Sequence, residues 1–199
     1  MTNVARNDPN SPTDEELIER FQQGDIHAFE QIVKRYKDPL LNFIYRFVGN
    51  QEQAEDLLQE TFLRVYRNRH AYRRVAKFST WIYTIAGNLA RTELRKRKRR
   101  RLLSISDLGV EEDKDYEVSD DEFNPEQHVD SLLHDEVIQR EINKLSPKFR
   151  EVIILRDIQE FSYEEISKIL RIPIGTVKSR VNRARLRLQS QLKKYLDKK

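Results

Sequence analysis

The sequence contains no cysteine, one tryptophan, five glycines and six prolines among its 199 residues. The lack of cysteine excludes disulfides and thiolate metal sites, and the scarcity of glycine and proline favours long helices joined by few turns. No run approaches the roughly eighteen apolar residues that a membrane-spanning helix needs. The N-terminus is polar and acidic and lacks the apolar core of a secretion signal. These absences favour a cytoplasmic protein without direct membrane insertion.

Charge is strongly segregated along the chain, although the formal net charge is only +4. Residues 91–101 hold eight basic residues and one acid, which leaves a local charge of +7. Residues 107–126 hold ten acids and one lysine (−9), and residues 168–199 hold eleven basic residues and one acid (+10). Two basic blocks that flank an acidic one favour a polyanionic partner, although charge alone fits any nucleic acid or acidic surface.

Four helical stretches predict an N-terminal domain over residues 13–101, because apolar residues recur there at three- and four-residue steps. Thr13 and Glu16 form a capping box at the start of the first helix. Pro39 lies inside the second helical stretch and is expected to kink or split it. The fourth helix is expected to begin near Ser79.

Residues 102–130 are acidic, poor in apolar side chains and without helical periodicity, which predicts a flexible interdomain linker. Asp113, Asp115 and Glu117 have the early spacing of a calcium loop. Val118, however, stands where such a loop requires glycine, so a solvated linker is favoured over a metal site. No cofactor is expected.

A second helical domain is predicted over residues 131–196, and no strand pattern occurs anywhere, so the expected fold class is all-α with two small domains. Ser146 and Pro147 supply an N-cap and a first-turn proline. Ser162 begins a second capping box. A short capped helix, a break of three or four residues and a long basic helix from Gly175 together predict a helix-turn-helix.

The last helix separates an apolar face from a polar one. Val177, Val181, Ala184 and Leu188 have the spacing of a face that packs on the core. The side chains beside them are of the types that contact bases and phosphates in a major groove. The alternative is a solvated basic face on an ordinary surface helix. The predicted DNA-binding residues are Thr176, Lys178, Ser179, Arg180, Asn182 and Arg183.

Three segments resemble motifs of bacterial RNA polymerase sigma factors and occur in the order of that family. The polymerase-binding helix is similar to AEDLLQETFLRVYRN, the −10-binding helix to KFSTWIYTIAGNLARTELRKRKR, and the −35-binding helix-turn-helix to FSYEEISKILRIPIGTVKSRVNRARLRLQ. The chain lacks the long middle domain and the N-terminal domain of housekeeping sigma factors, and so resembles the compact extracytoplasmic-function (ECF) group.

The resemblance implies that one face of the third helix binds the clamp helices of the largest polymerase subunit. That face mixes acids with an exposed apolar anchor, which suits a protein partner. It consists of Asp56, Gln59, Glu60, Phe62 and Leu63. The alternatives are an exposed acidic helix face and a carboxylate metal site, and no histidine or glycine-rich loop supports the latter.

The resemblance also implies a −10 element site on the fourth helix and on the connection before it, residues 67–77, where ECF proteins capture a flipped base. Aromatic rings among basic residues suit unpaired bases. The alternative is a solvated loop whose two aromatic rings pack inward. Trp81 is expected in the core, and promoter melting is expected to be weaker than in housekeeping factors, which have two tryptophans here. The predicted residues are Tyr72, Arg73, Arg74, Lys77, Phe78, Asn88, Arg91, Thr92 and Arg95.

The function implied is promoter recognition and opening with core RNA polymerase, without enzymatic activity. The expected partners are core RNA polymerase, including its flap region, promoter DNA and an inhibitory anti-sigma factor, with no small-molecule substrate. The acidic linker enters the RNA channel of the polymerase, screens the basic blocks or is a plain tether. Rival functions are a helix-turn-helix regulator that acts without core polymerase, a nonspecific RNA-binding protein, and a metal-dependent nuclease that uses Asp56 and Glu60.

Overall fold

The computed structural model describes residues 11–106 and 130–196, and within these ranges the chain is all-α without a strand. The prediction of an all-helical chain in two regions is therefore confirmed. No helix in the described ranges is long and apolar enough to cross a membrane. The helices are α1 (Asp14–Gln22), α2 (Ile26–Val48), α3 (Gln51–Arg67), the 3-10 turn η1 (Arg69–Ala71), α4 (Phe78–Ser106), α5 (Asp130–Lys144), α6 (Pro147–Ile153), the π-helical η2 (Ile154–Ile158), α7 (Tyr163–Leu170) and α8 (Ile174–Leu196).

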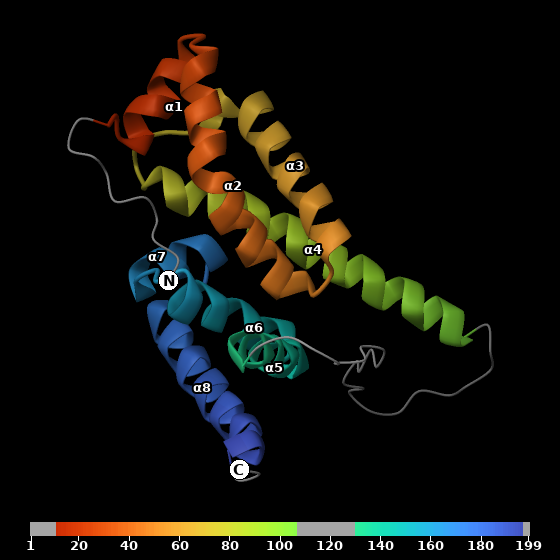
Figure 1. The fold of residues 1–199 in the computed structure, drawn as a ribbon. Helices are drawn as coiled ribbons and strands as arrows, with labels where there is room; N and C mark the ends of the chain where they lie inside the picture. The colour runs from red at the N-terminus through yellow and green to blue at the C-terminus, as the bar shows by residue number, and fades with distance from the viewer. Residues whose placement is uncertain (1–10, 107–129, 197–199) are drawn as a thin grey trace.

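Helices α1 to α4 pack together, and we call them the N-terminal bundle (Figure 1). The Thr13 hydroxyl accepts a hydrogen bond from the Glu16 amide at 3.2 Å, and the Glu16 carboxylate accepts one from the Thr13 amide at 2.7 Å, which confirms the first capping box. The side chains of Asp25 and Asn50 cap α2 and α3 by each accepting one hydrogen bond, from the Ala28 and Gln53 amides respectively. The starts of α1, α2 and α3 are thus specified locally, whereas the first amide of α4, that of Phe78, donates to the Glu15 carboxylate of α1 at 2.9 Å.

Pro39 does not split α2, which continues from Ile26 to Val48. A proline inside a helix removes one hydrogen bond and costs about 3 kcal/mol. The flanking Leu40 and Phe43 are fully buried, and burial of each such side chain contributes roughly 1.5–3 kcal/mol. Packing of the apolar face therefore outweighs the local penalty, and of the two expected effects, a kink or a split, the split does not occur.

Helices α5 to α8 form the C-terminal bundle. Pro147 occupies the first turn of α6 as predicted, but the hydroxyl of Ser146 makes no capping hydrogen bond and is buried without a hydrogen-bond partner. Ser146 therefore occupies the N-cap position as expected, but its side chain does not cap the helix. After α6 the chain widens into the π-helical turn η2, whose Ile154 and Leu155 are fully buried.

The helix-turn-helix consists of α7, three connecting residues and α8. Ser162 and Glu165 form the second capping box, with bonds of 3.2 Å and 2.9 Å. Arg171 ends α7 in the left-handed conformation at φ 55°, which turns the chain sharply toward α8. Helix α8 begins at Ile174, one residue before the predicted start. The predicted motif is therefore present.

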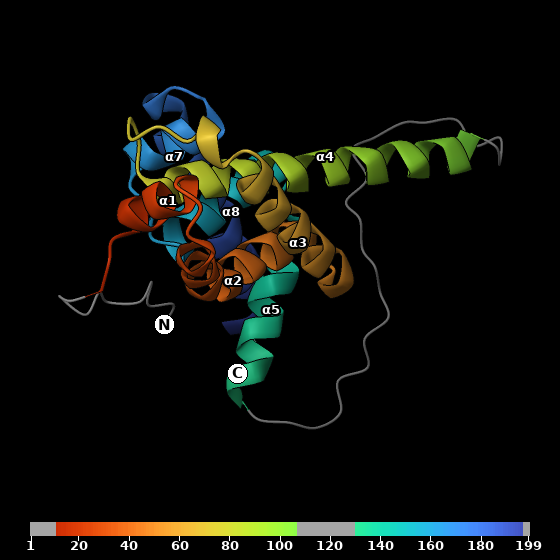
Figure 2. The same cartoon turned by 90° about the horizontal axis from the view of Figure 1, so that it is seen from above.

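The two bundles share one continuous hydrophobic core cluster rather than standing apart. Helix α4 packs against α7, and α2 packs against α5, α6 and η2. Both views show the C-terminal half of α4 projecting past the body of the molecule (Figures 1 and 2). Helix α4 extends to Ser106, five residues beyond the predicted end of the first domain. Most of the predicted linker lies outside the described residues. The calcium-like spacing within it lies wholly outside them.

Candidate nucleic-acid interface

Helix α8 presents a polar face to solvent because its apolar face is anchored in the core. Val177, Val181 and Ala184 are buried, as the spacing predicted, and Leu188 is half-buried. The intervening side chains are thereby held on the outer face in a fixed register. Of the predicted −35 residues, Lys178, Ser179, Asn182 and Arg183 are exposed, while Thr176 and Arg180 are half-buried.

Contacts to the neighbouring turn fix the orientation of α8. Arg185 binds Asp157 of η2 through two hydrogen bonds, of 2.9 Å and 2.5 Å. The Tyr163 ring lies between two cations, with the Lys178 ammonium 5.8 Å and the Arg156 guanidinium carbon 4.7 Å from its centroid. These contacts orient the helix, and the exposed positions on its outer face are left for a ligand.

Helix α4 carries its predicted polar residues on one face. Asn88, Thr92 and Arg95 are exposed, and Arg91 is half-buried. The Arg91 guanidinium is already bound by protein groups. It donates to the Asn88 side-chain oxygen at 2.6 Å and to the carboxylate of Glu151 on α6. The four residues are brought together as predicted, but one of them is already bound to the other bundle.

The two aromatic rings predicted for base capture are in the core. Tyr72 and Phe78 are 5% and 0% exposed and pack against each other edge-to-face at 5.6 Å. The Tyr72 hydroxyl donates to the Ala76 carbonyl at 2.8 Å, and burial raises the pKa of Tyr72 to about 12. The inward-packed alternative therefore describes their placement, because these rings complete the bundle around the half-buried Trp81. Neither ring is available to a base without repacking.

The loop between η1 and α4 exposes its other predicted residues. Arg73, Arg74 and Lys77 are exposed, and Val75 is 87% exposed. Arg74 lies 3.5 Å from a carboxylate oxygen of Glu19. Exposed cations beside an exposed apolar tip suit a nucleic-acid backbone and a base face. Val75 was not in the predicted set, and its signal in the sequence is a lone apolar residue within a basic loop.

Helix α3 exposes the five residues predicted to bind polymerase to different degrees. Asp56 and Gln59 are exposed, Glu60 pairs with Arg64 at 2.8 Å, and Leu63 is 47% exposed. Phe62 is half-buried against Phe29. Ile26 and Tyr66 are also exposed apolar side chains of the same bundle. Sequence reasoning missed both because each falls on a helical apolar stripe.

Glu151 is a buried carboxylate that the sequence analysis did not select. It is 5% exposed, and burial raises its pKa to about 7, against the opposing effects of the charges of Arg91 and Arg180. A glutamate within the apolar stretch from Phe149 to Leu155 was the available signal. Nothing in that pattern indicated which surface covers it.

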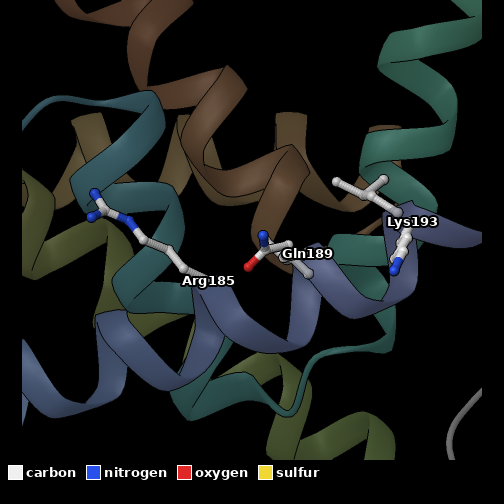
Figure 3. A pocket seen from close by; sticks show the side chains of 5 residues that line it. Arg185, Gln189 and Lys193 are labelled. Atoms are coloured by element: carbon white, nitrogen blue, oxygen red, sulfur yellow. The ribbon is translucent and has the colours of Figure 1, made fainter. Parts of the chain in front are cut away.

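The pocket drawn in Figure 3 is a surface hollow of about 450 Å³ along α8. Leu188 and Leu192 supply its apolar part, and Arg185, Gln189 and Lys193 surround it. All five lining residues belong to one helix, so the hollow does not enclose a ligand. In the described ranges, no three histidine, aspartate or glutamate side chains converge on a point that would hold a metal ion.

Comparison with known proteins finds two family matches in this arrangement. The family model described as Sigma-70 region 2 matches residues 32–100, and that described as Sigma-70, region 4 matches residues 135–188. The first covers most of the N-terminal bundle, and the second covers the helix-turn-helix. The two basic faces described above thus belong to separate modules.

Relatives span nearly the whole chain. The ECF RNA polymerase sigma factor SigW of Bacillus subtilis is 42% identical over 88% of this chain and 95% of its own length. The ECF RNA polymerase sigma-E factor of Haemophilus influenzae is 33% identical over 90% and 95%. The sigma factor RpoE of Bartonella quintana, solved in complex with the anti-sigma factor NepR, is 33% identical, covers 83% of this chain and 96% of its own, and superposes with a TM-score of 0.66. The chain belongs to the ECF family of RNA polymerase sigma factors.

Proposed function

We propose that the chain binds core RNA polymerase, recognises the −10 and −35 promoter elements and promotes promoter opening, without catalysing a reaction itself. The observation that carries this proposal is the pairing of two basic helical faces in one chain with region 2 and region 4 matches. Two DNA-reading modules on one chain suit a promoter with two separated elements. The relatives are named as sigma factors, which supports the same function.

The −35 element is read by α8 in this proposal. Lys178, Asn182 and Arg183 are exposed on a helix whose other side is fixed in the core. Arginine donates to guanine O6 and N7, and asparagine bonds to adenine N6 and N7, so the face carries base-discriminating chemistry. Ser179, Thr176 and Arg180 contact the backbone and set the register.

The −10 element is held by α4 and its preceding loop. Asn88, Arg91, Thr92 and Arg95 contact the exposed strand, while Arg73, Arg74 and Lys77 follow its backbone. Because the Tyr72 and Phe78 rings are buried, they support the loop rather than stack on a base. The face is therefore mainly polar, which favours sequence selection over strong melting.

Core polymerase binds α3 through its acids and the exposed Leu63. An exposed apolar anchor surrounded by charges has the composition of a protein interface. An anti-sigma factor is a further proposed partner, because the structural relative from Bartonella quintana was solved with one. The acidic residues between the bundles remain a candidate for the RNA channel of the polymerase.

Reconstitution with purified core polymerase on a promoter library tests the proposal. We expect run-off transcripts from a subset of promoters sharing two elements. Leu63→Asp should weaken core binding by about 30-fold or more, the loss of a hot spot of about 2 kcal/mol. Leu186→Asp, at an exposed leucine of the C-terminal bundle, is the matched control and should leave core affinity unchanged. Specific DNA binding without association with core polymerase would instead indicate an independent regulator.

A further inference from the structure

We propose that α1 is a positioning element for the loop between η1 and α4. We call residues 73–77 of this loop the tip loop. One face of α1 holds the chain at both ends of the tip loop and so sets which base of the −10 element the loop accepts. That face consists of Glu15, Glu19 and Gln22, which are four and three residues apart. The hydrogen bonds are independent of function, and their consequence for base selection rests on the proposed function.

The side-chain amide of Gln22 fixes the start of the tip loop. Its nitrogen donates to the Arg69 carbonyl at 2.7 Å and to the Tyr72 carbonyl at 3.1 Å. A primary amide has two N–H donors, and both are used here on main-chain carbonyls of η1 and of the residue that follows it. Gln22 is half-buried, so water replaces these bonds poorly if the amide is lost.

The carboxylate of Glu15 fixes the end of the tip loop. It accepts a hydrogen bond from the main-chain amide of Phe78 at 2.9 Å, and Phe78 is the first residue of α4. The first amides of a helix lack partners within the helix, and its N-terminus favours a negative charge. The residue before a helix often supplies the acceptor, but here that residue is Lys77, whose side chain has no acceptor. Helix α1 supplies it instead.

Internal hydrogen bonds shape the tip loop between these two ends. The Val75 amide donates to the Arg73 carbonyl at 2.7 Å, and the Tyr72 hydroxyl donates to the Ala76 carbonyl at 2.8 Å. Glu19 adds an exposed ion pair with Arg74 at 3.5 Å. Val75 is left at the tip, where it is 87% exposed. A loop that is shaped before its ligand arrives selects by fit, because less ordering is required on binding.

Helix α1 is itself anchored in the N-terminal bundle. Leu17 and Phe21 are buried in the core. The Arg35 guanidinium donates to Asp14 at 2.8 Å, and the Tyr36 hydroxyl donates to the same carboxylate at 2.5 Å. Helix α1 lies beside η1 and the start of α4 (Figure 1). Because α1 is fixed on its other side, loss of a hydrogen bond to the loop displaces the tip loop rather than α1.

Amide hydrogen exchange measured by NMR tests the hold on the loop without DNA. Glu15→Leu removes the acceptor of the Phe78 amide, whereas Glu15→Gln keeps an oxygen there. We expect the Phe78 amide to exchange at least about tenfold faster in Glu15→Leu, because local opening becomes easier. Glu15→Gln should stay close to the wild-type rate. Equal exchange of this amide in all three proteins would contradict the hold.

Transcription from a promoter library with core polymerase measures the consequence for base selection. Gln22→Glu sets a carboxylate against two carbonyl oxygens, and Gln23→Glu makes the same charge change at the exposed neighbouring position. We expect Gln22→Glu to weaken the base preference at one −10 position by about tenfold, of the order of one discriminating contact. Its −35 preferences, and all preferences of Gln23→Glu, should remain those of the wild type. A uniform loss on every promoter, or unchanged preferences in Gln22→Glu, would overturn the proposal.

A double-mutant cycle tests whether α1 acts through the tip loop. Val75→Ser removes the exposed apolar side chain at the tip. Gln22→Glu should then have little further effect on base preference, because coupled residues are not additive. Additive losses would assign the effect to another part of the chain. Thermal unfolding followed by circular dichroism verifies that each variant folds. If Gln22→Glu does not fold, Glu15→Leu against Glu15→Gln takes its place in the same assays.

The wild-type chain separates this inference from the proposed function. A wild type that gives core polymerase no choice among promoters refutes the proposed function, and exchange of the Phe78 amide still decides whether α1 holds the loop. A wild type that selects promoters, together with a Gln22→Glu variant that selects the same ones, refutes the positioning role and leaves the proposed function intact.

Discussion

Helices α4 and α8 carry similar side chains on the faces proposed to bind DNA but differ in what those side chains contact. On α8, Lys178, Asn182 and Arg183 are exposed, and Arg185 pairs with Asp157 of its own bundle. On the −10 surface, Arg91 binds a carboxylate of the opposite bundle. The comparison teaches that basic composition predicts a polyanion site, whereas its availability depends on which acids the tertiary fold brings near.

Arg183→Ala tests the exposed face of α8 and should have the largest effect. Loss of a bidentate contact to guanine costs about 1–3 kcal/mol, or roughly 5- to 150-fold in affinity, at one base pair of the −35 element. Anisotropy with duplexes that vary one position at a time measures the effect. Arg140→Ala removes the same charge from an exposed position on α5 and is the control. An equal loss on every duplex would contradict a base contact.

The pH dependence of the contact between the two bundles tests the α4 surface, where Arg91 binds Glu151. Burial raises the pKa of Glu151 to about 7. We expect separation of the bundles to expose this carboxyl to water, so that its pKa falls toward the ordinary 4.5. Between about pH 5 and 7 the packed state thus holds a proton that the separated state has lost. Raising the pH through this window favours separation, by up to about tenfold per pH unit. The charged groups that face Glu151 are Arg91 from α4 and Arg180 from α8.

Energy transfer between dyes on His27→Cys and Ser190→Cys, one exposed site on each bundle, measures this dependence at pH 5, 6, 7 and 8. Glu151→Gln imitates the protonated carboxyl, so its bundles should remain packed and show a nearly flat profile. Glu136→Gln, at an exposed position of α5, should keep the wild-type profile. The same slope in Glu151→Gln as in the wild type would assign the titration to another group.

Glu165→Gln should have the smallest effect. Its partner Lys77 is largely exposed, and exposed ion pairs contribute about 1 kcal/mol or less. Glutamine keeps the capping box of α7 with Ser162, so the helix itself should persist. We expect the contact between the bundles to weaken by less than about fivefold, measured by energy transfer against Glu164→Gln. A larger loss would mean that the two surfaces meet mainly at Lys77.

Local sequence signals predicted the helices well. The capping boxes at Thr13 and Ser162 and the apolar spacing on α8 depend on neighbours within one or two turns, so the sequence alone contains the relevant physics. Pro39 misled because its cost is local while the compensating burial of Leu40 and Phe43 comes from other helices.

The contacts between the bundles were not predictable in the same way. An apolar stripe indicates that a helix face is covered without indicating by what. Tyr72 and Phe78 illustrate this, because the sequence admitted both a base-binding loop and inward packing. Glu151 and Gln159 find partners 60 and 76 residues away, on α4. Only the tertiary arrangement pairs residues so distant in the chain.

Arg150 has a consequence for how this boundary tolerates mutation. Within the described residues, its guanidinium donates to the main-chain carbonyls of Phe47, Ile142, Asn143 and Leu145. Every amino acid offers the same carbonyl, so substitutions at those four sites leave the acceptors in place. Changes of side chain at those positions therefore spare these four hydrogen bonds as such, whereas loss of the Arg150 guanidinium removes all four at once.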